Sequence, residues 1–216
     1  MLALDRDGRV VRDTSPISGL NPGGGNFGPD GRYYVGLRNA RPIMAFSVGL
    51  DTEGERVLPP GIVPFPRGFA FGHDARLFLA SGIGPNGQGD NTIVSFILET
   101  PMQPAQLVVD RELSPLDLAI APNGNIVLAS ERPFGAPNAV TSVREYDAGD
   151  GHLVRVFSPS GLAELHQPRG LRFGPDGNLY CVAQDEVVAF DFASGACLGA
   201  MVRLPQLYGQ ALVFFP

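Results

Sequence analysis

Two arginines stand in the same short sequence, Pro-Arg-Gly, and could act together on a ligand. They are Arg67 and Arg169. A guanidinium group presents its N–H donors in a fixed fork that matches a carboxylate or a phosphate. The pair therefore predicts a site for a small anionic molecule. The alternative is that each arginine forms an ion pair with Asp117, Glu131 or Glu164.

Two long loops predicted at 82–91 and 131–139 add further polar candidates. The full set of candidate ligand-binding residues is Arg67, Asn91, Asp117, Glu131, Arg132, His166 and Arg169. Histidine is the side chain that titrates nearest neutral pH, but a single histidine such as His166 is more often a surface or hydrogen-bonding residue. No catalytic residue is therefore assigned from the sequence.

The chain lacks the short motifs of several enzyme classes. It contains no G-x-S-x-G, HExxH or P-loop sequence. The run from Gly82 to Gly87 has the glycine spacing of a dinucleotide-binding loop, but no helical pattern follows it. Cys181 and Cys197 have neither CxxC spacing nor a nearby histidine, which favours two reduced thiols over a metal site.

Composition points to one folded domain with many turns. The 216 residues are 44% hydrophobic and include 28 Gly and 20 Pro. The net charge is −6 and the charges are scattered, which argues against nucleic-acid binding. No apolar run approaches the ~18 residues of a membrane span, and the start shows no signal peptide. We expect a soluble protein, cytoplasmic by default or secreted if the natural chain is longer, whose partner is a small molecule or a protein.

Four segments repeat one pattern: an apolar strand, a turn of the Pro-Asp-Gly type and a second strand. They cover residues 26–35, 70–79, 119–128 and 172–181. Asp-Gly and Asn-Gly supply the positive φ that tight hairpins need. The equivalent residues Phe27, Phe71, Ile120 and Phe173 follow one another after 44, 49 and 53 residues. A repeat of this length built from strands alone is typical of a β-propeller blade.

Each repeat continues with further strands, so we expect four antiparallel strands per blade. Third strands are predicted at 43–48, 93–98, 143–147 and 187–191. The two ends of the chain resemble parts of a fifth blade, whose inner strand would come from the C-terminus. We therefore predict one domain of five blades, and a truncated six-bladed propeller is the alternative. The predicted boundaries are 19–62, 63–113, 114–162 and 163–206 for blades 1 to 4, and 1–18 with 207–216 for the closing blade.

Residues 173–180, Phe-Gly-Pro-Asp-Gly-Asn-Leu-Tyr, with the preceding Pro-Arg-Gly-Leu, resemble the blade motif of NHL-repeat propellers and of the gluconolactonase and senescence-marker propeller family. The resemblance implies an all-β propeller over nearly the whole chain. Its lactonase branch also implies a divalent cation held by Glu, Asn and Asp. The matching positions are Gly23, Arg67, Leu116, Arg169 and Gln210, and none has such a side chain. No cofactor or metal is therefore predicted, with a cation such as Ca as the alternative.

Two functions fit these observations. One is a binding scaffold that recognises a small anionic ligand or a protein partner on the face carrying loops 82–91 and 131–139, because long loops on a rigid scaffold commonly carry function. The alternative is a hydrolase or lyase of gluconolactonase-like type, with its site at the mouth of the central channel. The enzyme alternative requires a carboxylate or histidine within hydrogen-bond reach of the arginines. The scaffold predicts exposed Ile83 and Phe134 instead.

Overall fold

A computed structural model describes most of the chain. The described residues are 2–4, 7–13, 22–37, 43–47, 54–58, 63, 65–82, 91–98, 104–110, 112–131, 141–157, 165, 167–205, 207, 209 and 211–214. All regular elements among them are strands. Within these residues there is no helix long and apolar enough to cross a membrane.

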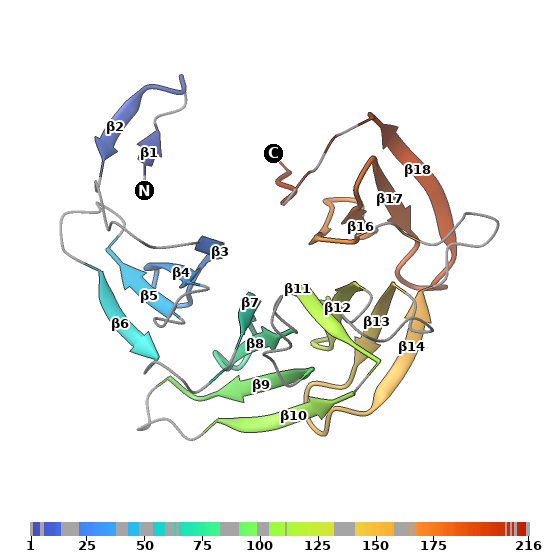
Figure 1. Cartoon of the computed structure of the whole chain (residues 1–216), viewed down its shortest axis with the longest axis horizontal. Helices are drawn as coiled ribbons and strands as arrows, with labels where there is room; N and C mark the ends of the chain where they lie inside the picture. The colour runs from blue at the N-terminus through green and yellow to red at the C-terminus, as the bar shows by residue number, and fades with distance from the viewer. Residues whose placement is uncertain are drawn as a thin grey trace.

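Four antiparallel sheets of four strands each are arranged around a common centre (Figure 1). Blade 1 consists of β3 (Pro22–Phe27), β4 (Tyr33–Leu37), β5 (Ile43–Phe46) and β6 (Glu55–Leu58), and blade 2 of β7 (Pro66–Phe71), β8 (Leu77–Ser81), β9 (Thr92–Phe96) and β10 (Ala105–Val109). Blade 3 consists of β11 (Ser114–Ile120), β12 (Ile126–Glu131), β13 (Ser142–Tyr146) and β14 (Leu153–Phe157), and blade 4 of β15 (Gly170–Phe173), β16 (Leu179–Val182), β17 (Glu186–Phe190) and β18 (Cys197–Arg203). The predicted all-β fold with four-stranded antiparallel blades is confirmed.

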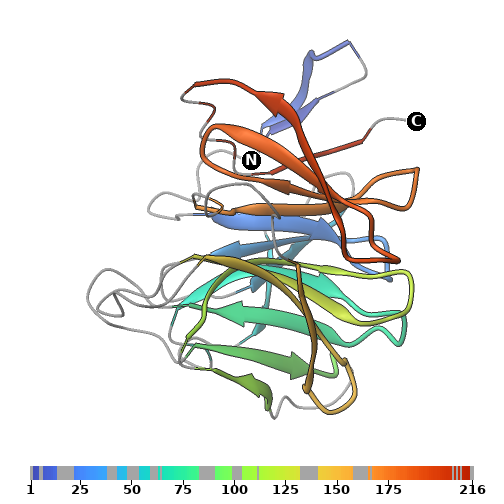
Figure 2. The same ribbon diagram turned by 90° about the vertical axis from the view of Figure 1, so that its right-hand side faces the viewer.

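The first strand of each blade lies at the centre of the ring and the fourth at its rim. Strand β7 contacts β3 and β11, and β11 in turn contacts β15. Within each blade the spatial order of the strands follows the chain. Figure 2, seen from the side, shows the sheets as twisted layers stacked face to face. The inner strands therefore surround the centre of the ring, where the candidate residues were expected.

The hairpin between the first and second strands repeats with the same geometry in all four blades. An Asp or Asn side chain accepts a hydrogen bond from the backbone N–H two residues later, at Asp30, Asp74, Asn123 and Asp176. The next residue has positive φ, at Gly31, Ala75, Gly124 and Gly177. Ala75, with φ of 62°, is the one of the four that carries a Cβ in this left-handed conformation. These turn residues thus have a structural explanation.

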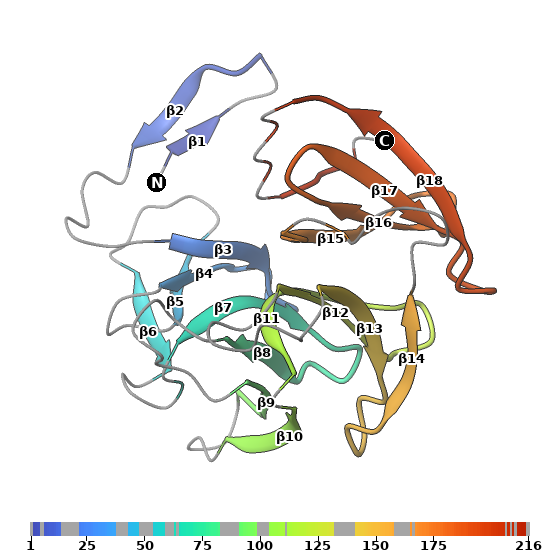
Figure 3. The same ribbon diagram turned by 45° about the vertical axis from the view of Figure 1, so that its right-hand side comes forward.

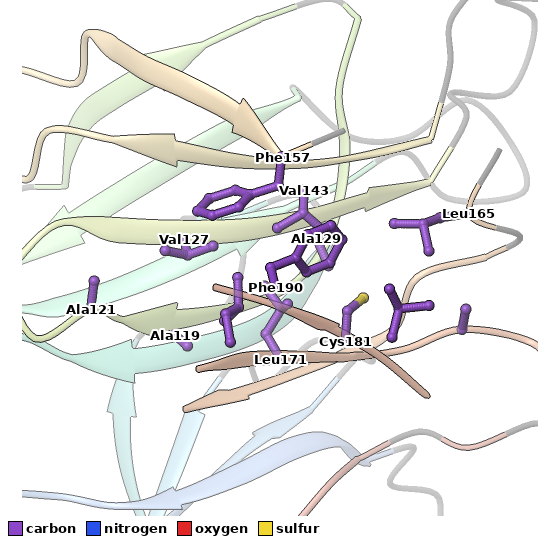
Figure 4. Close-up of a cluster of buried hydrophobic side chains, with 13 residues drawn as sticks. Ala119, Ala121, Val127, Ala129, Val143, Phe157, Leu165, Leu171, Cys181 and Phe190 are labelled. Carbon is purple, nitrogen blue, oxygen red and sulfur yellow. The ribbon is translucent and has the colours of Figure 1, made fainter. Parts of the chain in front are cut away.

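Apolar side chains fill the spaces between neighbouring blades. Successive side chains of a strand point to opposite faces of its sheet. Blades 2 and 3 have a neighbouring blade on each side, so both of their faces are buried. One cluster joins blades 3 and 4, and Figure 4 shows Phe157 and Phe190 within it. Their ring centroids are 5.6 Å apart in an edge-to-face arrangement. Two further clusters join blades 1 and 2 and blades 2 and 3.

The two ends of the chain do not share a sheet in the described residues. β1 (Leu2–Leu4) and β2 (Val10–Asp13) form a two-stranded sheet on their own. Residues 211–214 are not in a strand, although Phe214 packs on Tyr180 of blade 4 with centroids 4.9 Å apart. Figure 3 shows an opening in the ring between the β1–β2 hairpin and this C-terminal segment. The predicted closure into five blades is therefore not confirmed.

Candidate functional site

Arg67, Asp117, Glu131 and Arg169 lie at the end of the ring where the first strands begin and the second strands end, and we call this the channel end. Five of the seven predicted residues lie in the described part of the chain. Arg132 and His166 lie outside the described residues, as do Ile83, Phe134 and most of both long loops. The site is therefore built here from the ends of β7, β8, β11, β12 and β15.

Two inner strands are irregular at this end. The pairing of β7 with β8 shifts register between Pro66 and Phe69, and the pairing of β11 with β12 shifts between Pro115 and Asp117. Such β-bulges re-aim side chains and are common next to active sites. Arg67 lies within the first irregular stretch, and Asp117 ends the second. The backbone is thus distorted where the sequence places candidate ligand-binding residues.

Asp117 on β11 contacts both neighbouring blades. Its Oδ2 accepts hydrogen bonds of 3.1 Å from the backbone N–H of Leu171 and 3.1 Å from Nη1 of Arg172, both on β15. On the other side, a Cβ at Gly68 of β7 would overlap Oδ1 of Asp117, so only glycine permits this approach. The Asp117 side chain is 14% exposed. Its carboxylate therefore sits where blades 2, 3 and 4 meet.

The environment of Asp117 changes its acidity. Burial raises the pKa of Asp117 above its usual value, and this outweighs the opposing effects of Arg172 and of the N–H groups of Leu171 and Leu118. Burial acts in this direction because the charged form loses its hydration. A carboxyl group with a raised pKa exchanges a proton closer to neutral pH than an ordinary aspartate does, which is a property of acid–base catalysts.

Arg67 extends from blade 2 to blade 3. Its Nη2 lies 3.5 Å from Oε1 of Glu131 at the end of β12, and its guanidinium carbon is 4.4 Å from the centroid of the Phe65 ring. The Arg67 side chain is 12% exposed. The predicted alternative of an ion pair between blades is thus present for Arg67, and its partner is Glu131. The aromatic ring and the carboxylate hold the guanidinium in place at the channel end.

Arg169 is held by the chain around it. Its Nη2 donates a hydrogen bond of 3.0 Å to Oε1 of Gln167, and its backbone N–H donates to the carbonyl oxygen of Val182 at 2.8 Å. Gln167 itself has φ of 50°, an uncommon conformation for a residue with a side chain. Arg169 is thus fixed by its neighbour just before β15 begins.

The two Pro-Arg-Gly segments converge on Asp117. Gly68, which follows Arg67, and Leu171, two residues after Arg169, approach the two oxygens of the same carboxyl group. The structure thus places Asp117 between the segments that carry the two arginines.

Asn91 has a different position from the one expected of a ligand-binding residue. It is buried, and its Nδ2 donates a hydrogen bond of 2.5 Å to the carbonyl oxygen of Leu113. Its own carbonyl oxygen accepts a hydrogen bond of 3.2 Å from the N–H of Asp110. Asn91 therefore ties the start of β9 to the connection between blades 2 and 3.

Sequence reasoning missed Arg172, the arginine that pairs with Asp117. The equivalent positions of the other repeats are Asn26, Ala70 and Ala119. A long cationic side chain where the other blades have a small residue was the signal that could have revealed it. With Arg172 included, three arginines lie at this end, and two of them form ion pairs across blades: Arg67 with Glu131 and Arg172 with Asp117.

The described side chains at this end do not fit a divalent cation. Two positions that match the lactonase ligand set are Arg67 and Arg169, which are cations themselves. The nearby carboxyl group, Asp117, already accepts hydrogen bonds from Arg172 and a backbone N–H. A hard cation needs several oxygen ligands, and the two arginines supply none.

A second group of potential metal ligands lies on the face of the ring opposite the candidate site, in the turn between β13 and β14. Asp147, Asp150 and His152 have potential ligand atoms within 4.8 Å of one another. Asp147 accepts a 2.7 Å hydrogen bond from the N–H of Gly149, and Asp150 lies 2.6 Å from Nδ1 of His152. These bonds within the turn explain the arrangement without an ion.

Comparisons with known proteins agree with this architecture. No family model and no curated protein matches the sequence. Among solved structures, a gluconolactonase from Xanthomonas campestris has a TM-score of 0.72 and 16% identity over 99% of this chain and 71% of its own. Virginiamycin B lyase from Staphylococcus aureus has a TM-score of 0.65 and 14% identity over 96% of this chain and 64% of its own. The chain thus spans less than two thirds of the length of that lyase.

Identities this low show the fold alone. The likeness confirms the fold that the resemblance to gluconolactonase-like proteins implied. The resemblance to NHL-repeat propellers is not confirmed. The chain therefore has the β-propeller fold that gluconolactonase-like proteins and virginiamycin B lyase also have.

Proposed function

We propose that this protein binds a small anionic molecule at the channel end formed by the starts of β7, β11 and β15. The observation that carries the proposal is the local charge. Arg67, Arg169 and Arg172 gather there, in a chain whose net charge is −6. A carboxylate or phosphate group is the ligand chemistry that such an arrangement favours.

Arg67 is the arginine best prepared for this role. It is largely buried, and charges interact more strongly where water is partly excluded. Phe65 and Glu131 already restrict its movement. Binding therefore loses less side-chain entropy than it would with a freely rotating arginine. Arg169, held by Gln167, supplies a second guanidinium at the same end of the channel.

Isothermal titration calorimetry tests the proposal. The probes are inorganic phosphate, succinate and gluconate, with glucose as the neutral comparison. We expect heat of binding for at least one anion, and a loss of about tenfold or more in affinity in the Arg67→Ala/Arg169→Ala variant. Arg9→Ala is the matched control, because Arg9 is an exposed arginine paired with Asp7 near the N-terminal hairpin. Equal affinity in the double variant and the wild type would contradict the proposal.

A second candidate function is hydrolysis or elimination at the same place. Asp117 favours it, because a carboxyl group with a raised pKa next to Arg172 can move a proton while the arginines stabilise developing negative charge. Structures of this fold include a gluconolactonase and virginiamycin B lyase. The name of the first of these is that of an enzyme that acts on a lactone, so we propose a lactone as the substrate class.

Gluconolactone hydrolysis, followed in a pH-stat, tests this second candidate. Asp117→Asn is expected to abolish turnover and keep the melting temperature. Asp74→Asn is the control, since Asp74 bonds within its own turn, to Arg76. A wild-type rate equal to the spontaneous rate, or full activity of Asp117→Asn, would remove the enzyme candidate and leave the binding proposal standing.

A further inference from the structure

The position three residues before the end of each inner strand is glycine in three blades and aspartate in one. The four equivalent residues are Gly24, Gly68, Asp117 and Gly170. Blade 3 therefore carries a carboxyl group where the other blades have no side chain. A largely buried charge costs stability unless it is compensated, and departures of this kind from a repeated pattern are expected at functional sites.

The ion pair between Asp117 and Arg172 lies at the inner edge of blade 4. Strand β15 is paired with β16 along its outer edge, so the N–H of Leu171 that donates to Oδ2 of Asp117 projects from the inner edge. Nη1 of Arg172 donates to the same oxygen at 3.1 Å. The carboxylate and the guanidinium therefore meet beside the centre of the ring, at the channel end.

The guanidinium of Arg172 keeps one edge for a ligand. Among the described residues, both of its hydrogen bonds come from Nη1, one to Asp117 and one to the carbonyl oxygen of Leu171. The Arg172 side chain is 32% exposed, against 14% for Asp117. An arginine binds an anion through two neighbouring N–H groups, and Nη2 and Nε form such an edge. An anion can therefore reach the same cation that stabilises the charged form of Asp117.

An anion on Arg172 would act mainly on the proton of Asp117. A second negative charge beside a carboxylate disfavours its charged form, more so when the two compete for one cation. Glu131 is paired with a different arginine, Arg67. Cys181 lies opposite Leu171 in the pairing of β15 with β16 (Figure 4), and burial raises the pKa of its thiol, which stays neutral. Among the described residues, the charged or titratable groups on the elements packed against Asp117 are Arg67 on β7, Glu131 on β12, Arg169 just before β15, Arg172 on β15 and Cys181 on β16.

We propose that an anion at the channel end binds Arg172 in competition with Asp117, and that Asp117 takes up a proton from the solvent as the anion binds. The inference rests on the proposed anion binding and adds its regulation by pH.

The direction of the pH effect follows from linkage. Burial already raises the pKa of Asp117 in the unliganded protein, and a bound anion raises it further. The affinity for the anion is therefore highest at low pH. It falls as the pH rises through the interval between the unliganded and the liganded pKa of Asp117, and it is constant on either side of that interval.

Isothermal titration calorimetry in buffers of different ionisation enthalpy counts the protons taken up with each anion. The probe is sulfate, whose charge is constant between about pH 4 and about pH 8, the range in which the linkage is sought. The wild type should take up as much as one proton per sulfate, and its affinity should fall by about threefold to tenfold per pH unit where the dependence is steepest. Asp117→Asn should bind sulfate with no proton uptake and with an affinity independent of pH.

Two further variants complete the test. Asp117→Gly, which restores the residue of the other three blades, should also bind without proton uptake and serves if the amide disturbs folding. Asp110→Asn is the matched control, because Asp110 forms a similar ion pair, 2.9 Å from Arg144, after the outer strand of blade 2. It should keep the proton uptake of the wild type.

The outcomes separate this inference from the proposed function. Sulfate binding to the wild type without proton uptake at any pH, or equal uptake in Asp117→Asn, would overturn the inference and leave anion binding intact. A wild type that binds other anions but no sulfate would overturn it as well. Only a wild type that binds none of the anions would contradict the proposed function itself.

Discussion

Blade 3 holds two buried carboxyl groups that respond to burial in opposite ways. Glu145 on β13 is 1% exposed, and Asp117 on β11 is also largely buried. Each has an arginine within hydrogen-bond distance: Arg155 for Glu145 and Arg172 for Asp117. Burial by itself would raise the pKa of both groups. In Glu145 the hydrogen-bond donors outweigh burial and the pKa is lowered, whereas in Asp117 burial outweighs the donors and the pKa is raised.

The closeness of the donors contributes to the difference. Glu145 accepts hydrogen bonds of 2.9 Å from Asn123, 2.7 Å from Asn125 and 2.6 Å from Arg155. The bonds that Asp117 accepts from Leu171 and Arg172 are longer, 3.1 Å each, and the N–H of Leu118 also lowers its pKa. Fully satisfied buried charges support a structure, while partly satisfied ones are costly and concentrate at functional sites. The comparison therefore separates a structural carboxylate from the candidate functional one.

The structural carboxylate is a feature of blade 3 alone. In the strand registers, the positions equivalent to Glu145 are Ala45, Ser95 and Ala189. Arg155, which bonds Glu145, also donates a hydrogen bond of 3.2 Å to the carbonyl oxygen of Ala193 in blade 4. The buried charge thus anchors an arginine that joins two blades.

Replacing Glu145 by Ala, the residue of blades 1 and 4, should have the largest effect. We expect a loss of about 3 kcal/mol in the free energy of unfolding, because Arg155 and two amides lose their shared acceptor in a buried site. Urea unfolding measures it. Glu55→Ala, which breaks the exposed pair with Arg32, should cost less than about 1 kcal/mol. Equal losses in the two variants would contradict the structural role of Glu145.

The two carboxyl groups should give opposite pH dependence. Since the pKa of Glu145 is lowered from 4.5, its contribution to stability is complete above that pH and is lost as the pH falls. Since the pKa of Asp117 is raised from 3.8, its contribution is present below that pH and is lost as the pH rises through the folded-state pKa.

Unfolding of the wild type, Glu145→Gln and Asp117→Asn between about pH 3 and about pH 7 measures both contributions. The stability advantage of the wild type over Glu145→Gln should grow with pH, and its advantage over Asp117→Asn should shrink. Parallel curves for the two variants would show that the two sites do not differ.

Removing one hydrogen-bond donor should raise the pKa of Glu145, as burial raises that of Asp117. Asn125→Ala deletes a hydrogen bond to the carboxylate, with an expected loss of about 1.5 kcal/mol and a higher pKa for Glu145. Asn178→Ala is the matched control in blade 4, where the equivalent amide bonds the exposed Asp176. The pKa of Glu145 can be followed by NMR titration, and no change in Asn125→Ala would refute the donor explanation.

Asp117→Asn should have the smallest effect on stability, within about 1 kcal/mol of the wild type at neutral pH. The amide keeps an oxygen acceptor for Leu171 or Arg172 and avoids the burial of a charge. Thermal and urea unfolding measure this change. A loss as large as that of Glu145→Ala would show that Asp117 is a structural carboxylate too.

Much of the fold was predictable because its signals are local. The aligned residues Phe27, Phe71, Ile120 and Phe173 are the last residues of β3, β7, β11 and β15. The third strands also begin within one residue of their predicted positions. The candidate site was predictable only in part: Arg67, Asp117 and Glu131 lie at one end of the channel, but Asn91 is buried between blades and Arg172 was missed.

The sequence by itself determined the hairpins, the strand alternation and the repeat, because turn chemistry and side-chain alternation act between residues close along the chain. Only the tertiary structure decided which side chains meet across blades. Asp117 and Leu171 are far apart in sequence, and the stacking of the sheets, together with a β-bulge and a glycine at position 68, brings them into contact. Pairing between the chain ends likewise depends on how the sheets pack around the centre, and the described residues of the two ends do not share a sheet.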